Sequence, residues 1–359
     1  MLDRLPIELL RLILDLTVPP EHAYSAYDER VQFLAKLSLV NKAFRGVAQP
    51  MLWRTFRPVK GMLEALRESK EAAKLIRVFQ VKGKDKPNFA SVFKALALLS
   101  NVEEVSMALY WERLTKPTLT AFSTLRTLTL SELTISGGAG VTYPHLTSLS
   151  LHSTFLPRDL SAKLFSKSTL PKVTDIAITD LADRKTGPYF PVLSALFSQL
   201  SLLQVRAEDS TILPSTLFQQ TFPILLSYAL STSRPIPNLV PSQVLHVQLG
   251  ALSALNHLPR PNGFDWQKWV VQSNLSSFKA LLKDIPTLQT LFLPAQLHPD
   301  FPLPAHVAEW RSELHTLCVL RDVRIIWRFE AKEPEDDLGI SREFREFARQ
   351  KRSLEQGGQ

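Results

Sequence analysis

The sequence predicts an α/β protein, with a helical module at the N-terminus followed by a long parallel sheet built from repeats. In the first fifty-odd residues, apolar side chains recur every three or four positions, which is the spacing of amphipathic helices. From residue 76 onward a short apolar signal returns at fairly regular intervals, which is typical of a repeat array. A chain of 359 residues with 45% hydrophobic residues is large enough to bury the core of such an array.

Residues 1–56 form the first predicted domain. Pro6 suits the first turn of a helix, because its missing N–H costs nothing there and its φ is already helical. Two apolar stripes follow, one at Leu9, Leu10, Ile13, Leu14 and Leu16, the other at Leu34, Leu37, Val40, Phe44 and Val47. These helices are more apolar than a short segment needs if it packs only on itself.

The order of these signals resembles an F-box. The resemblance is carried by Leu5-Pro6-Ile7-Glu8-Leu9-Leu10, then Leu39-Val40-Asn41-Lys42-Ala43-Phe44, then Leu52-Trp53. It implies a three-helix module that docks on the Skp adaptor of a cullin–RING ubiquitin ligase. The adaptor-binding residues that it implies are Leu5, Pro6, Leu9, Ile13, Leu39 and Val40. One segment departs from the family, since many F-boxes have only a short connection where this chain has Thr17 to Arg30, which we expect to loop out.

Residues 57–75 are predicted to link this domain to the repeats. Gly61 to Lys74 has the pattern of an amphipathic helix, with Leu66 and Ala73 on its inner side.

Residues 76–327 carry the repeating signal, an apolar residue followed by two more at the third and fifth positions beyond it. The occurrences are Ile76/Phe79/Val81, Val102/Val105/Met107, Leu125/Leu128/Leu130, Leu146/Leu149/Leu151, Val173/Ile176/Ile178, Leu200/Leu203/Val205, Leu225/Tyr228/Leu230, Val244/Val247/Leu249, Leu288/Leu291/Leu293 and Leu320/Val323/Ile325. The last two positions of each signal are two apart, so in a strand they point to the same face. Each occurrence therefore predicts one strand of a parallel sheet.

The spacing resembles that of leucine-rich repeats, whose period is about 20–29 residues. The resemblance implies a solenoid in which stacked units bury a continuous core. The asparagine or cysteine that the family places three residues past the last strand leucine is absent, because Leu133, Thr154, Leu181 and Glu208 occupy that position. The 25 prolines also predict short or broken helices between strands, so we expect an irregular solenoid.

Two segments interrupt or follow the array. Residues near 264–285 are predicted to form a helical insertion. Residues 328–359 are a charged tail in which Ser341 starts a helix with Phe344, Phe347 and Leu354 on one side. Such a helix could cap the last repeat, since terminal units must cover an exposed core, or it could be a mobile tail.

Composition limits the functions and cellular locations that we expect for this protein. The net charge of +8 is spread out, and the clusters Lys82 to Lys86 and Lys351-Arg352 are interpreted as solvated surface rather than as a nucleic-acid site. The lone Cys318 fits a reducing compartment, and no stretch is apolar enough for a membrane span, so we expect a cytoplasmic or nuclear protein. No histidine, cysteine or glycine pattern indicates a metal, cofactor or catalytic set, and we expect a protein that is not an enzyme.

What remains is surface for binding. In the repeat arrangement, residues that flank the strand leucines face away from the core, and four of them are candidates for contacting a target protein: His152, Arg206, His246 and Gln248. The resemblances together imply a substrate-recognition adaptor of a ubiquitin ligase, with the chemistry done by other subunits. The alternative is a repeat-based interaction scaffold whose N-terminal helices only cap the array.

Overall fold

The computed structural model describes residues 6–18, 27–58, 66, 68–82, 89–137, 140–157, 160, 163–179, 194–207, 227–232, 244–249, 282–283, 285–294, 305–328 and 342–357. The chain divides into two compact units, Met1–Leu146 and Thr147–Gln359. Each unit combines helices with parallel strands, which confirms the predicted α/β class. Leu5 and most of the predicted insertion near 264–285 lie outside the described residues.

Three helices open the first unit, as predicted: α1 (Ile7–Thr17), α2 (Tyr27–Ser38) and α3 (Lys42–Arg54). Asn41 ends the connection between α2 and α3 and caps α3, because its side-chain oxygen accepts a hydrogen bond of 2.9 Å from the backbone N–H of Phe44. The second predicted stripe, which runs through residue 40, is therefore divided between two helices. The segment Thr17 to Arg30 does not loop out as a whole, since its last four residues belong to α2 and Arg30 is buried.

The core of this bundle draws on all three helices. It consists of Leu10, Leu14, Val18, Leu34, Phe44, Val47, Ala48 and Met51, with Leu37 and Leu52 packed against it. The first predicted stripe does not pack as one face, because Leu10 and Leu14 point into this core whereas Leu9, Ile13 and Leu16 are exposed. The physical reason is that α1 is apolar over more than one side, and a single neighbouring bundle can cover only one side of a helix.

The strands of the first unit are β1 (Thr55–Phe56), β2 (Val78–Lys82), β3 (Glu104–Leu114) and β4 (Thr127–Ile135), and each is parallel to the next. The helices between them are α5 (Lys70–Leu75), α6 (Phe89–Leu98) and α7 (Lys116–Ala121). The register aligns Phe79, Val105 and Leu128 in one row. Ser69 caps α5, so the predicted helix from Gly61 to Lys74 is interrupted at Ser69; Leu66 and Glu68 before it are also helical, and Gly61 lies outside the described residues.

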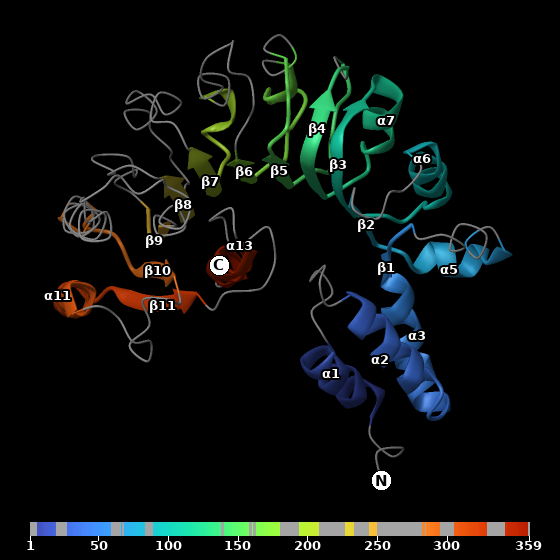
Figure 1. The fold of residues 1–359 in the computed structure, drawn as a ribbon, viewed down its shortest axis with the longest axis horizontal. Coiled ribbons are helices and arrows are strands. Elements are labelled where there is room, and N and C mark those ends of the chain that lie inside the picture. Colours follow the sequence, from blue (N-terminus) through green and yellow to red (C-terminus); the bar gives the residue numbers. More distant parts are fainter. Residues whose placement is uncertain are drawn as a thin grey trace, which may run out of the picture. The chain divides into compact units, whose positions relative to one another are not determined.

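The second unit repeats this pattern with β5 (Ser148–His152), β6 (Asp175–Thr179), β7 (Leu202–Ala207), β8 (Ser227–Thr232), β9 (His246–Leu249), β10 (Thr290–Pro294) and β11 (Arg324–Arg328). These strands are parallel and adjacent in sequence order. The described helices are η3 (Ser194–Leu196), α11 (Ala305–Leu320) and α13 (Arg342–Gly357), and Figure 1 shows α11 and α13 on opposite sides of β10 and β11.

Each predicted signal coincides with a strand, but the last is shifted. The helix α11 extends through Leu320, and the register then pairs Leu291 with Ile325 and Leu293 with Trp327. Val323 therefore precedes the strand instead of lying within it. The strand β1 was not predicted, because two residues are too short to show a periodic pattern.

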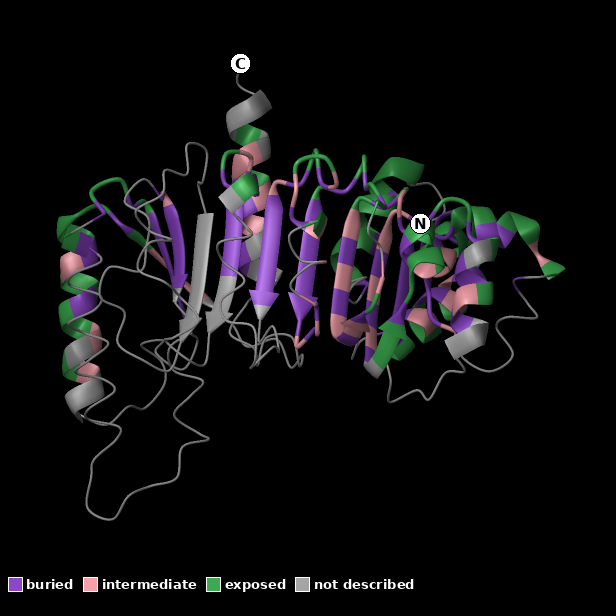
Figure 2. Cartoon of the chain, turned by 90° about the horizontal axis from the view of Figure 1, so that it is seen from above, coloured by how far each residue is buried: buried purple, intermediate pink, exposed green. Residues whose placement is uncertain are grey.

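The alternation within each strand separates two faces of the second unit. One row, formed by Leu149, Ile176, Leu203, Val247 and Leu291, is buried and apolar. The neighbouring positions form the opposite face. Figure 2 shows how strongly burial is concentrated in the described strands.

The bundle core predicts a clear contrast in stability. Leu34 is 0% exposed, so Leu34→Ala should lower the free energy of unfolding by about 2–5 kcal/mol through lost apolar contacts and a residual cavity. Leu39, which is exposed, is the matched control, and Leu39→Ala should change the free energy of unfolding by no more than about 0.5 kcal/mol. Urea titration followed by circular dichroism measures both, and equal losses would contradict the assignment of the core.

Candidate protein-interaction surfaces

The N-terminal bundle exposes an unusual amount of apolar side chain. On α1, Leu9 is 47% and Ile13 41% exposed, and Pro6 just before the helix is exposed as well. At the turn between α2 and α3, Leu39 is 77% and Val40 61% exposed. All the predicted adaptor-binding residues that the structure describes are thus accessible. Exposed apolar side chains gathered on one small module are often found where another molecule binds.

Further exposed apolar residues enlarge the surface on α1. Ile7, Leu12 and Leu16 are each more than half exposed, although none of them was predicted to bind a partner. Because Leu10 and Leu14 already supply the contacts that hold α1 to the bundle, the exposed residues are not needed for internal packing. We call the exposed apolar residues of α1, together with Leu39 and Val40, the bundle surface.

A buried cation ties this bundle to the strands of the first unit. The Arg57 guanidinium lies 3.9 Å from the ring centre of Tyr27 on α2, and its Nη2 donates a hydrogen bond of 3.0 Å to Oε1 of Gln80 on β2. Burial raises the pKa of the Tyr27 hydroxyl, and the nearby positive charge of Arg57 acts against that rise. The cation–π contact and the hydrogen bonds fix the orientation of α2 against β2.

The predicted target-binding residues of the second unit are not open to solvent. His152, His246 and Gln248 are buried, which corrects the expectation that they line an open face. Arg206 lies in β7 at the register position opposite Thr179, and its side chain lies outside the described residues. His246 and Gln248 share a face with Leu202 and Phe292, as the register of the strands requires.

The helix α13 covers part of this face with aromatic side chains. Phe344 and Phe347 both contact the ring of Phe292 edge-on, with ring centres 5.0 and 4.9 Å apart. Phe347 also meets the ring of His246 edge-on at 5.1 Å. Leu202, Ala348 and Ile326 complete the apolar cluster. Such edge-to-face pairs add to the stabilisation from apolar burial.

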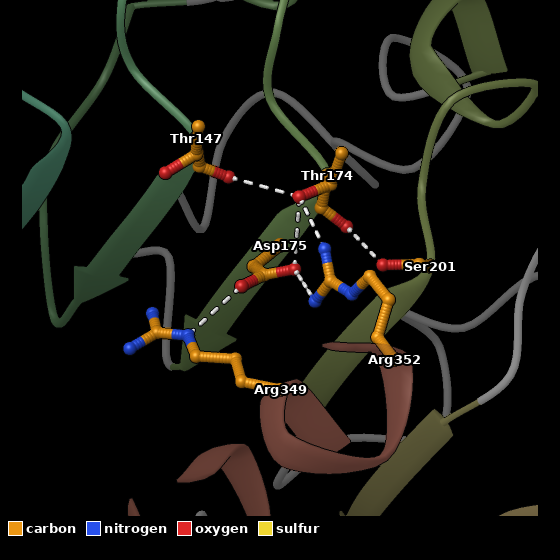
Figure 3. Close-up of polar contacts among 6 residues, drawn as sticks. All are labelled: Thr147, Thr174, Asp175, Ser201, Arg349 and Arg352. Atoms are coloured by element: carbon orange, nitrogen blue, oxygen red, sulfur yellow. Dashed lines mark hydrogen bonds and ion pairs between the residues drawn. The ribbon is translucent and has the colours of Figure 1, made fainter. Parts of the chain in front are cut away.

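The same helix neutralises a buried carboxylate. Nη2 of Arg352 lies 2.6 Å from Oδ1 of Asp175, and Nε of Arg349 lies 3.1 Å from Oδ2 (Figure 3). Nη1 of Arg352 also donates to the hydroxyl of Thr174 at 2.7 Å. Since the Asp175 side chain is only 6% exposed, these charge-assisted contacts are stronger than an ordinary surface ion pair.

The structure corrects three expectations about the C-terminal segment. The helix is present, and Phe344 and Phe347 face inward, but Leu354 is exposed. Arg352 is an ion-pair partner rather than part of a solvated cluster. The helix lies across strands from β6 to β11 instead of covering only the end of the array. The phenylalanines and arginines at helical spacing were a sequence signal for this helix. Nothing in the sequence singled out Asp175 as the partner of the arginines.

His246 is an unusual group on this face. Its side chain is 2% exposed, and neither Nδ1 nor Nε2 has a hydrogen-bond partner among the described residues. Burial lowers the pKa of His246 to about 4, and the positive charge of Lys351 on α13 contributes in the same direction. The neutral imidazole is therefore the form compatible with a docked α13.

The described residues contain no group of histidine, cysteine, aspartate and glutamate side chains able to hold a metal ion. None of the described helices has the length and apolar character needed to cross a membrane. No known family model and no curated protein sequence matches the chain.

Replacing Asp175 tests the ion pairs. In Asp175→Ala the arginines of α13 lose a charged acceptor worth about 1.5–3 kcal/mol, so amide exchange in residues 342–357 should accelerate by about tenfold or more. Glu103 is the control, because this half-exposed carboxylate contacts Arg77 and Arg126 on the surface of the first unit. Glu103→Ala should leave exchange in α13 unchanged. Unaltered exchange in Asp175→Ala would mean that the ion pairs do not hold the helix.

The docking of α13 should also weaken in acid. The pKa of His246 is lowered from about 6.5, so its stabilising contribution is complete above that pH and is lost as the pH falls toward 4. Between pH 7.5 and 5 the docking of α13 loses at most about 2 kcal/mol, because only the part of the burial that α13 supplies contributes. Hydrogen exchange of α13, corrected for the intrinsic pH dependence of exchange, measures this. The variant His246→Phe keeps an aromatic ring but cannot titrate, and should remove most of the pH dependence.

Proposed function

We propose that this chain is a non-catalytic substrate-recognition adaptor of an SCF-type cullin–RING ubiquitin ligase. Its N-terminal bundle is an F-box-like module that docks on the Skp adaptor, and its strands form an irregular leucine-rich-repeat solenoid that holds a target protein. The adaptor acts in the cytoplasm or nucleus. Ubiquitin transfer is done by other subunits, and the adaptor contributes by holding the target near them.

One observation carries the proposal. The bundle has a complete core of its own and still exposes a second apolar surface at the positions where the F-box resemblance places adaptor-binding residues: Leu9, Ile13, Leu39 and Val40. A bundle that served only as a cap would have no reason to expose these side chains. A partner with an apolar groove would bury them, and binding energy concentrates in such anchors.

Two features support the repeat part of the proposal. The strands follow one another in parallel and in sequence order within each unit, as stacked repeats require. The register also aligns the equivalent apolar positions of successive signals, such as Ile176, Leu203 and Val247. This is the arrangement expected when each repeat contributes one strand to a shared core.

A second candidate is a repeat-based interaction scaffold that is not linked to ubiquitination. It is favoured by the buried contact of Arg57 with Tyr27 and Gln80, which fastens the bundle to the first strands as a cap would be fastened. In that case, deleting residues 1–56 should destabilise the array, and no Skp adaptor should bind.

A binding assay with purified Skp adaptor tests the proposal. The wild-type chain should bind, and Leu9→Glu/Ile13→Glu should weaken binding by at least about tenfold, because charges would enter an apolar contact. Leu75→Glu/Leu98→Glu is the matched control, since these residues are 40% and 44% exposed but lie outside the bundle surface. Failure of the wild type to bind, or equal binding by both variants, would refute the proposal.

A further inference from the structure

The face covered by α13 has the properties of a site for an exchangeable helix. We propose that this face binds an amphipathic basic helix of a target protein, and that α13 occupies it in the same chain until the target displaces it. The proposal deepens the function proposed above by naming the chemistry of the target helix. It rests on that function, because it requires that the chain binds a target protein. The face itself is defined by Thr174, Asp175, Leu202, His246, Phe292 and Ile326.

The chemistry of the occupant follows from the way α13 is held. Phe344, Phe347 and Ala348 are three and four positions apart, so they share one side of the helix and fill the apolar half of the face. Arg349 and Arg352 each lie five positions after one of the two phenylalanines and reach Asp175. A competing helix therefore needs two large apolar side chains three positions apart, each followed five positions later by an arginine.

Arginine is specified over lysine at the second of these positions. The Arg352 guanidinium donates through different nitrogens to two acceptors, Asp175 and Thr174. An ammonium group lacks the planar fork that allows one side chain to satisfy both acceptors in this geometry. The buried carboxylate also selects against acidic or neutral helices, because leaving Asp175 without a cation would be costly.

His246 indicates that α13 is not the best ligand for the face. This side chain is almost wholly buried, yet the described residues offer no hydrogen-bond partner to either ring nitrogen. Phe347 covers it with an apolar ring that can accept or donate nothing of comparable strength. A buried polar group without a partner lowers the stability of the docked state. A target helix with a polar side chain at this position would satisfy His246 and bind better than α13.

Exchange of α13 would leave the strands of the second unit intact. Residues 329–341 separate β11 from α13, so the helix is joined to the unit by thirteen residues of sequence. The apolar cluster and the ion pairs named above are contacts between side chains, and they can be broken without altering the pairing of any strand. Exchange would expose the inner side of α13 and the face that it covers, and each of these combines apolar with charged side chains.

The test uses the full-length chain and a fluorescent synthetic peptide with the sequence of residues 342–357. In the wild type α13 competes with the peptide, so binding should be weak. In Arg349→Glu/Arg352→Glu the helix is repelled by Asp175, and peptide affinity should rise at least tenfold. A peptide carrying the same two glutamates is the control and should not bind. Adding Asp175→Arg to the variant chain should restore α13 docking and reduce binding of the wild-type peptide again.

A second measurement covers the case in which the variant does not fold. A fluorophore attached through Gln350→Cys, an exposed position of α13, reports undocking in an otherwise wild-type chain, and excess unlabelled peptide should change its anisotropy. Absence of peptide binding to a folded variant, or equal affinity for wild type and variant, would overturn the proposal. A wild-type dimer that dissociates in the variant would show instead that a second copy supplies the helix, and would also overturn it.

Binding of the Skp adaptor is measured in the same samples. It depends on the bundle surface, so its loss would count against the proposed function and leave the peptide result intact. Peptide binding depends on the face of the second unit. Failure there would remove the inference about the target and leave the adaptor function standing.

Discussion

The need to neutralise one buried carboxylate governs the arrangement of the second unit. Asp175 begins β6 with its side chain almost wholly buried, and a charge in that environment is stable only beside a cation. The residues Arg349 and Arg352 supply it from α13. Docking of the helix then places Phe344 and Phe347 against Phe292 and buries His246. The aromatic contacts contribute stability, whereas the ion pairs specify where along the sheet the helix lies.

The first unit is organised by a different constraint, the surplus of apolar side chains in α1. Leu10 and Leu14 satisfy the bundle core, and the remaining apolar residues have no place inside a three-helix module of this size. Arg57 meanwhile fixes α2 against β2. A rigidly mounted apolar surface suits a docking function, because little conformational entropy is lost when a partner covers it.

Strand positions were predictable from the sequence because period-two apolar pairs such as Phe79 and Val81 report local geometry. The same reasoning failed where another element produced a similar pattern, as the apolar end of α11 did near Leu320. The adaptor-binding residues stay a prediction from the motif, and only the packing of the bundle shows which apolar residues face outward. The position of α13 on the sheet was not predictable, because its ion pair joins Arg349 to Asp175 across 174 positions of sequence.

The covalent attachment of α13 has a consequence for any partner. Because the helix belongs to the same chain as the face that it covers, the face meets α13 at a local concentration that does not fall when the protein is diluted. A free protein at cellular abundance can compete only if its helix binds far more tightly, or if a second contact raises its own local concentration. Covalent attachment, and not only the chemistry of the face, therefore sets how tightly a competing helix must bind.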